Sequence, residues 1–181
     1  PEDQQKELYL KVLLEVDNPQ LSKLNLSYEQ KNLDLSGTKG LVDLDALNVL
    51  QCKKLNLSHC DITDIHQLKV DNLKSLDCSF SSLLRIPQWS KVNFEFLDLS
   101  FCPIASVEPL ALCSIKDLRV VGLTRSVQPL QSYKKIKSIT IALRYKGDQL
   151  LGDPRLKFQK LSDDELKRVV RLFHFLQMDL S

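Results

Sequence analysis

The stretch that decides the fold runs from Cys52 to Ile104 and reads CKKLNLSHCDITDIHQLKVDNLKSLDCSFSSLLRIPQWSKVNFEFLDLSFCPI. It repeats one frame three times: an L-x-L unit, whose second Leu is Cys78 in the middle copy, then Cys or Ser three positions later, then an apolar residue two positions after that. Outward from this stretch, the first L of the unit falls on Leu33, Leu55, Leu76, Leu97, Leu118 and Ile139. The steps between these positions are 22, 21, 21, 21 and 21 residues, so the chain is an internal repeat.

Each repeat predicts two short elements. In the L-x-L unit, apolar residues alternate with period two, which predicts a short strand with one buried face. The next ten residues carry apolar residues three or so apart, as at Ile62, Ile65 and Leu68, and this spacing suits a 3₁₀-like return segment. Because one repeat cannot bury its own apolar edge, stacked repeats are expected to form a parallel sheet and a solenoid.

The frame L-x-x-L-x-L-x-x-(N/C)-x-L resembles that of the leucine-rich-repeat family, over roughly 21–143. The short period is similar to the SDS22-like class rather than to the ribonuclease-inhibitor class. The stretches LDLSGTKGLVDLDAL and LDLSFCPIASVEPLAL also look like repeats of bacterial signalling proteins, including those joined to serine/threonine kinases. The resemblance implies an α/β solenoid with a concave parallel sheet and short 3₁₀ or helical segments on the convex side.

Helices are expected at both ends of the array. Residues 1–20 should form an N-terminal helical cap, because Tyr9, Val12, Leu13 and Val16 share one helical face. Residues 21–145 hold about six repeats of 21–22 residues. Residues 146–181 are basic and should end in a helix that covers the last repeat and begins with a capping box at 162–165. Its cations Lys167, Arg168 and Arg171 could bind an acidic partner, but we favour a solvated face.

Composition narrows the class of protein. The 181 residues carry a formal charge of +2, which argues against a general binder of polyanions. There are five cysteines, an odd number without the dense spacing of a secreted scaffold, which favours buried free thiols in a reducing compartment. The sequence has no apolar run long enough to span a membrane and no signal-peptide pattern at its start. We therefore expect an intracellular, cytoplasmic protein.

Residues for catalysis or metal binding are not indicated. The three histidines, His59, His66 and His174, belong to no HExxH, GxSxG or P-loop pattern, and no two cysteines have CxxC spacing. Cys60 occupies the Asn/Cys position of its repeat, so a structural role is favoured over a thiol or metal site with His59. We expect no catalytic residue, metal or cofactor.

The predicted site is the concave face, onto which alternation points the residues between the strand leucines. It comprises Asp34, Asn56, Asp77, Phe80, Phe96, Asp98, Phe101 and Arg119. Asp77 and Asp98 should lie close together, an arrangement that a cationic partner would stabilise, although a solvated acidic face is an equal alternative. Phe96 is the better candidate for an exposed anchor. Phe80 and Phe101 either face outward or fold over the sheet edge.

These expectations lead to a non-catalytic protein-protein interaction module, a scaffold or signalling component. Its partner is expected to be another protein with a basic patch. A column at the strand starts carries mostly lysines (Lys31, Lys53, Lys74, Glu95, Lys116 and Lys137). It lacks stacking aromatics, so nucleic acid is not expected, nor is a membrane. We expect a monomer. The alternative is the regulatory or targeting region of a larger enzyme, such as a serine/threonine kinase whose catalytic domain lies outside this chain.

Overall fold

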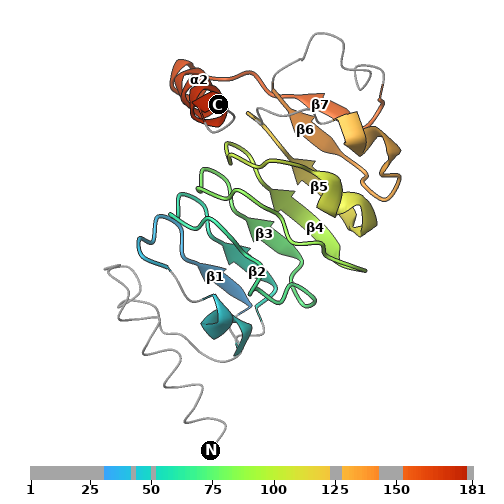
Figure 1. Ribbon diagram of the computed structural model, residues 1–181. Helices are drawn as coiled ribbons and strands as arrows, with labels where there is room; N and C mark the ends of the chain where they lie inside the picture. The colour runs from blue at the N-terminus through green and yellow to red at the C-terminus, as the bar shows by residue number, and fades with distance from the viewer. Residues whose placement is uncertain (1–30, 42–43, 50–51, 123–127, 143–152, 179–181) are drawn as a thin grey trace, which may run out of the picture.

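The chain folds into a solenoid whose strands form one parallel sheet (Figure 1). The computed structural model describes residues 31–41, 44–49, 52–122, 128–142 and 153–178. Seven strands follow one another in chain order across the sheet. They are β1 (Asn32–Asp34), β2 (Lys54–Asn56), β3 (Ser75–Asp77), β4 (Asn93–Asp98), β5 (Ser114–Arg119), β6 (Ile139–Ile141) and β7 (Leu156–Phe158). The expected N-terminal cap lies outside the described residues.

The predicted register of the repeats is confirmed. Neighbouring strands pair so that the repeat position aligns from rung to rung, from Leu33 through Leu55, Leu76, Leu97 and Leu118 to Ile139. Each of these side chains is at most 2% exposed. Burial of one such side chain contributes about 1.5 to 3 kcal/mol, so the aligned column is the main apolar spine of the core.

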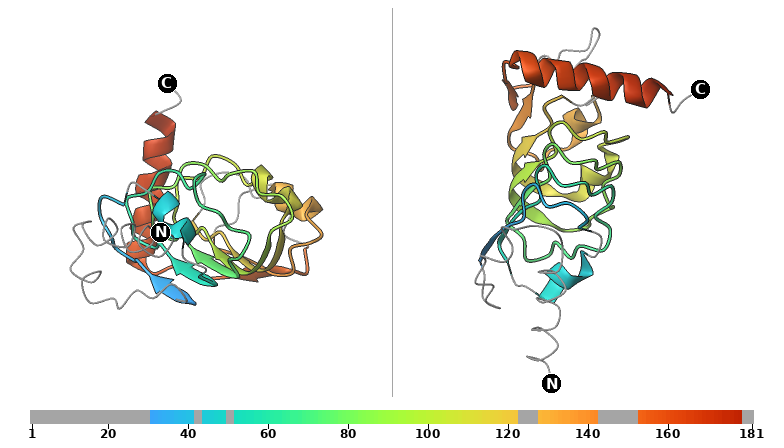
Figure 2. Two further views of the ribbon diagram at one scale, coloured as in Figure 1. Left: turned by 90° about the horizontal axis from the view of Figure 1, so that it is seen from below. Right: turned by 90° about the vertical axis from the view of Figure 1, so that its left-hand side faces the viewer.

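The return segments form the second layer, behind the sheet (Figure 2). Three of them contain 3₁₀ helices: η2 (Asp45–Val49), η3 (Glu108–Leu112) and η4 (Gln128–Ser132). The others are irregular, yet they bury the apolar residues that the repeat spacing singled out, such as Ile62, Ile65 and Leu68. The core therefore lies between the sheet and the return segments.

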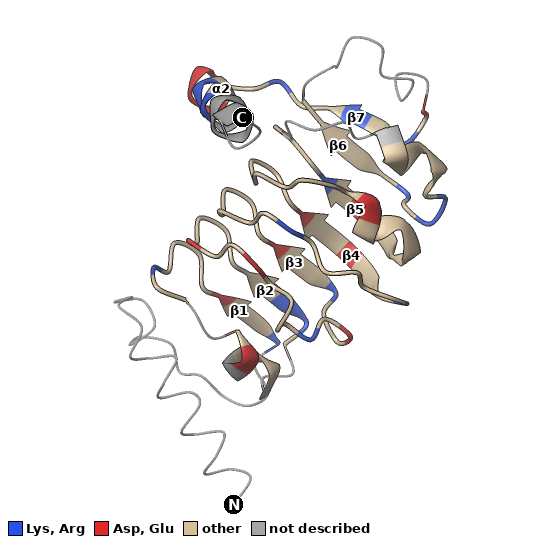
Figure 3. Ribbon diagram, viewed as in Figure 1, with Lys and Arg blue, Asp and Glu red and all other residues tan. Residues whose placement is uncertain are grey.

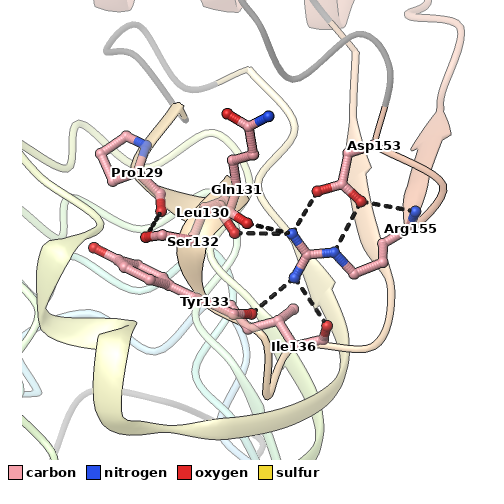
Figure 4. Close-up of polar contacts among 8 residues, drawn as sticks. All are labelled: Pro129, Leu130, Gln131, Ser132, Tyr133, Ile136, Asp153 and Arg155. Carbon is pink, nitrogen blue, oxygen red and sulfur yellow. Dashed lines mark hydrogen bonds and ion pairs between the residues drawn. The ribbon is translucent and has the colours of Figure 1, made fainter.

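A seventh strand extends the sheet beyond residue 145, where the array was expected to end. Strand β7 pairs in parallel with β6, with Leu156 opposite Ile139. Just before it, the guanidinium of Arg155 donates hydrogen bonds to the carbonyl oxygens of four residues in and after η4 (Figure 4). They are Leu130, Gln131, Tyr133 and Ile136. Arg155 thus ties the segment before β7 to the last return segment and closes this end of the solenoid.

The pair of Arg155 with Asp153 completes this end structure. The Nε of Arg155 donates to Asp153 Oδ1 over 2.8 Å, and its second nitrogen contacts the other carboxylate oxygen. The side chains are only 16% and 6% exposed. The hydrogen bonds from Arg155 hold the pKa of Asp153 below its ordinary value. A bidentate pair of this kind fixes the guanidinium plane, which aims its remaining donors at the carbonyls.

Helix α2 (Asp163–Met178) begins with the predicted capping box. The amide of Ser162 donates to Glu165 Oε2 over 2.8 Å, and the amide of Glu165 donates to Ser162 Oγ over 3.3 Å. Val169 packs against Phe101 and Val121, and Ala142, which follows β6, packs against the same cluster. The helix thus lies on the side of the molecule where the strands lead into their turns (Figure 1).

Arg168 is not the solvated cation that we expected. One of its terminal nitrogens donates to the carbonyl oxygen of Phe80 over 2.9 Å, and its guanidinium carbon lies 4.8 Å from the centre of the Phe80 ring. Arg168 therefore docks α2 onto the repeats. Lys167 keeps the expected character, since it is exposed and, among the residues the structure describes, pairs with Asp164 of the same helix, over 3.2 Å.

Candidate functional site

The sheet turns one face away from the core, here called the open sheet face. The predicted site column crosses it in register, with Asp34 opposite Asn56, Asn56 opposite Asp77, Asp77 opposite Asp98, and Asp98 opposite Arg119. The acidic positions in β1, β3 and β4 are visible in Figure 3. The predicted proximity of Asp77 and Asp98 is therefore confirmed.

The acidic column has a structural role that sequence reasoning missed. In four consecutive repeats, the side-chain oxygen of the column residue accepts a hydrogen bond from the backbone amide two residues later. The pairs are Asp34 with Ser36 (3.0 Å), Asn56 with Ser58 (2.9 Å), Asp77 with Ser79 (2.8 Å) and Asp98 with Ser100 (2.9 Å). Each bond closes an Asx turn that leads the chain out of the strand. One oxygen of each side chain is thus committed to the fold.

Asp98 was predicted to contact a partner, but it is only 7% exposed. Burial raises the pKa of its carboxyl, a shift that the hydrogen bonds from Ser100 oppose and the neighbouring charge of Asp77 reinforces. Arg119 on the next strand partly offsets these effects. The expectation of an accessible carboxylate at position 98 is therefore wrong, although Asp34, which closes the same turn in the first rung, is exposed.

The alternative in which the phenylalanines fold over the sheet edge is the correct one. His59, Phe80 and Phe101 occupy the same position in consecutive turns, and their rings form one stack. The ring centres are 4.6 Å apart for His59 and Phe80 and 4.4 Å apart for Phe80 and Phe101. Phe101 is 1% exposed, so its predicted contact with a partner is wrong, and Phe80 is half-buried in the middle of the stack.

Phe96 and Arg119 form a pair on the open sheet face. The guanidinium carbon of Arg119 lies 5.2 Å from the centre of the Phe96 ring, within the range of a cation-π contact. Phe96 is half-buried and Arg119 is exposed. The prediction that Phe96 lies outside the core is confirmed, and Arg119 is the residue that covers part of its ring.

A shallow hollow of about 280 Å³ lies on the open sheet face over β1 to β4, and we call it the sheet hollow. Its lining residues are Asn32, Leu33, Asp34, Lys54, Leu55, Asn56, Ser75, Asp77 and Phe96. It thus brings together four predicted site residues, Asp34, Asn56, Asp77 and Phe96, whereas the other four lie outside its lining. Two carboxylates and one ammonium leave it with a formal charge of −1.

A second hollow, of about 270 Å³, lies on the loop side. Its carboxylates are used within the chain: both oxygens of Asp61 accept the amide of Gly40, and Asp64 pairs with His66 over 3.1 Å. The pair with His66 contributes to the lowered pKa of Asp64, which burial opposes. This hollow is therefore held together by its own polar groups.

The five cysteines are free and buried, as predicted. Cys60 donates to the carbonyl of Leu35 over 3.2 Å, and Cys102 donates to the carbonyl of Cys78 over 3.0 Å. Burial raises the pKa of Cys102 and of Cys113 to about 11. A thiol with so high a pKa is a poor nucleophile at neutral pH, so these residues fill the core and satisfy loop carbonyls.

Within the described part of the chain, no group of three or more His, Cys, Asp or Glu residues could hold a metal ion. The same residues include no helix with the length and apolar character needed to cross a bilayer. Comparison with protein-family models, with curated proteins and with solved structures found no match. The open sheet face and its hollow are therefore the basis for a functional proposal.

Proposed function

We propose that this chain is a leucine-rich-repeat protein that binds the basic surface of another protein on its open sheet face. The 21-residue register, the parallel pairing of the L-x-L strands and the buried Cys or Ser near each turn support the family. In this proposal the domain is a non-catalytic, intracellular module, because five unpaired thiols suit a reducing compartment.

The sheet hollow is the observation that carries the proposal. It combines a floor formed by strands β1 and β2 at Leu33 and Leu55 with the carboxylates of Asp34 and Asp77 and the ring of Phe96. An aromatic side chain beside charges is the usual composition of an energetically important contact. The excess of carboxylates favours a partner that inserts a lysine or arginine into the hollow. The ammonium of Lys54 could then donate to a polar or acidic side chain next to the inserted residue.

The test compares capture by three forms of the protein. The first variant is Asp77→Asn combined with Phe96→Ala, and the matched control is Arg85→Ala, which removes an exposed charge from a return segment. Asparagine at position 77 keeps the turn, since Asn56 closes the same turn one repeat earlier. Proteins retained on the immobilised chains are quantified by mass spectrometry, and the affinity of each captured protein is then measured.

We expect a specific partner to lose about 1 to 3 kcal/mol of binding energy with the hollow variant, because each side chain is an anchor. The control should bind like the wild type. A partner that binds the hollow variant normally and the Arg85 control poorly would place the interface on the return segments and refute the proposal. Near-identical melting temperatures of the three forms exclude unfolding as the cause.

A further inference from the structure

The ring stack occupies only three of five equivalent turns. The turn residues Gly37, His59, Phe80, Phe101 and Gly122 all have positive φ, between 58° and 71°. The three rings stack in the middle, and a glycine lies at each end. The two glycine positions are therefore places where a further planar group could extend the stack.

At the C-terminal end of the stack this place is filled. A Cβ on Gly122 would lie 2.8 Å from Cδ1 of Phe101 and 3.0 Å from Cγ2 of Val169. Helix α2 supplies Val169, which packs on Phe101 together with Val121. The fold thus covers the outer face of the last ring with a side chain from a distant segment.

At the N-terminal end the place is open. A Cβ on Gly37 would meet no atom of the described residues within 4 Å. His59 is exposed, and within the described residues its only ring contact is with Phe80, at an angle of 5° between the planes. One face of the imidazole is therefore stacked and the other faces the side of Gly37, where a planar group could lie against it. We call this space the Gly37 slot.

An arginine already contacts this ring stack within the molecule, at its side, because both faces of Phe80 are covered by His59 and Phe101. Arg168 contacts the Phe80 ring and donates to the Phe80 carbonyl, one turn along the stack. Among the described residues none donates to the carbonyl oxygen of His59. A guanidinium in the Gly37 slot could therefore stack on His59 and donate to this carbonyl, as planar guanidinium groups do on aromatic rings.

Charge near the slot favours the same group. Asp34 begins the turn that contains Gly37, and Asp61 follows His59 by two residues; both carboxylates are exposed. Lys39 is the one cation close by in the chain. Asp34 also lines the sheet hollow, so the slot adjoins the surface proposed for a basic partner.

We propose that the Gly37 slot binds an arginine side chain of the partner protein, stacked on the free face of His59. This inference rests on the proposed function and gives its partner a specific residue type. An arginine is required rather than any cation, because a lysine ammonium lacks the plane that completes the stack.

The experiment is a titration of the protein followed by NMR. The probe is the blocked peptide acetyl-Gly-Arg-Gly-amide, and the control is the same peptide with lysine in place of arginine. We expect saturable shifts of the His59 ring protons and the Gly37 amide, with Kd in the millimolar range for so small a contact. The lysine peptide should bind at least about fivefold more weakly. Gly37→Phe should abolish the shifts, because phenylalanine already adopts this turn conformation at positions 80 and 101.

A second measurement does not depend on binding. Gly37→Phe should melt at a higher temperature than Gly37→Ala, since both variants incur the cost of a positive φ but only the phenylalanine ring can stack on His59. Equal melting temperatures would show that the slot does not accept a ring.

The outcomes of the titration are distinguishable. If the arginine and lysine peptides bind equally, the site recognises positive charge alone. If acetyl-Gly-Trp-Gly-amide binds more tightly than the arginine peptide, the slot suits an aromatic group. Either result overturns the inference, as does the absence of any shift. The variant Asp77→Asn with Phe96→Ala should leave the arginine shifts unchanged. A negative result for the sheet hollow as a partner site can therefore be told apart from a negative result for the Gly37 slot.

Discussion

The two glycines at the ends of the ring stack allow a steric prediction with an internal control. Gly37 and Gly122 have the same φ of 71°, so alanine at either position incurs the same backbone cost, about 1 to 2 kcal/mol. Only at Gly122 does the new methyl group also meet Phe101 and Val169, at 2.8 to 3.0 Å. Overpacking of this kind typically costs a further 1 to 3 kcal/mol or so. Gly122→Ala should therefore lower the free energy of unfolding by about 2 to 5 kcal/mol, and Gly37→Ala by about 1 to 2 kcal/mol.

Urea unfolding followed by the fluorescence of Trp89, the single tryptophan, measures both values. Trp89 is 6% exposed in the folded state, so its emission should report the loss of the core. In a Phe101→Ala background, the additional cost of Gly122→Ala should shrink, because the ring carbons are then absent. A difference between the two glycine variants below about 0.5 kcal/mol would refute the packing of α2 against the stack.

Three further predictions concern charge, the solenoid end and the thiols. Asp98→Asn should raise stability at pH 7, because burial raises the carboxyl pKa above its ordinary 3.8 and ionisation in the folded state therefore lowers the free energy of unfolding. Urea titrations should show the gain fading as the pH falls through the raised pKa and gone below 3.8, and a gain that persists below 3.8 would contradict this cause. Arg155→Lys should lower the free energy of unfolding by about 2 to 3 kcal/mol in the same assay, since an ammonium cannot reach four carbonyls and a carboxylate together. A decrease under about 0.5 kcal/mol would show that Arg155 does not close the solenoid end. The five buried thiols should react slowly with a disulfide reagent in the native protein and fully in urea, whereas fast native labelling would contradict their burial.

The sheet register could be predicted because it depends on spacing alone. A leucine column with steps of 21 residues has one way to stack, and the pairing of Leu55, Leu76 and Leu97 follows it. Strand β7 gave no such signal, since Leu156–Phe158 is followed by no Cys or Ser position and no return segment. Its place in the sheet depends on the tertiary contacts of Arg155, which spacing does not reveal.

The site was harder to predict, because alternation along a strand gives the face of a residue but not what its side chain does there. Asp98 and Phe96 both precede the turn on the predicted face, yet one closes an Asx turn and the other stays open to a partner. A signal for the first was present: each acid or amide in the column is followed by Ser two residues later. Phe101 was misplaced because a positive φ at the strand exit turns its side chain back over the sheet edge.

The rung-by-rung pairing of the strands also bears on how the molecule would yield to a mechanical load. Each strand is bonded only to the strands before and after it, so a force on the chain ends would detach one repeat at a time rather than shear the whole sheet. One repeat of 21 residues, drawn out fully, spans about 70 Å. The hydrogen bonds of Arg155 join η4 to the segment before β7, so the end nearest the C-terminus should resist extension longest once α2 has been pulled off the stack.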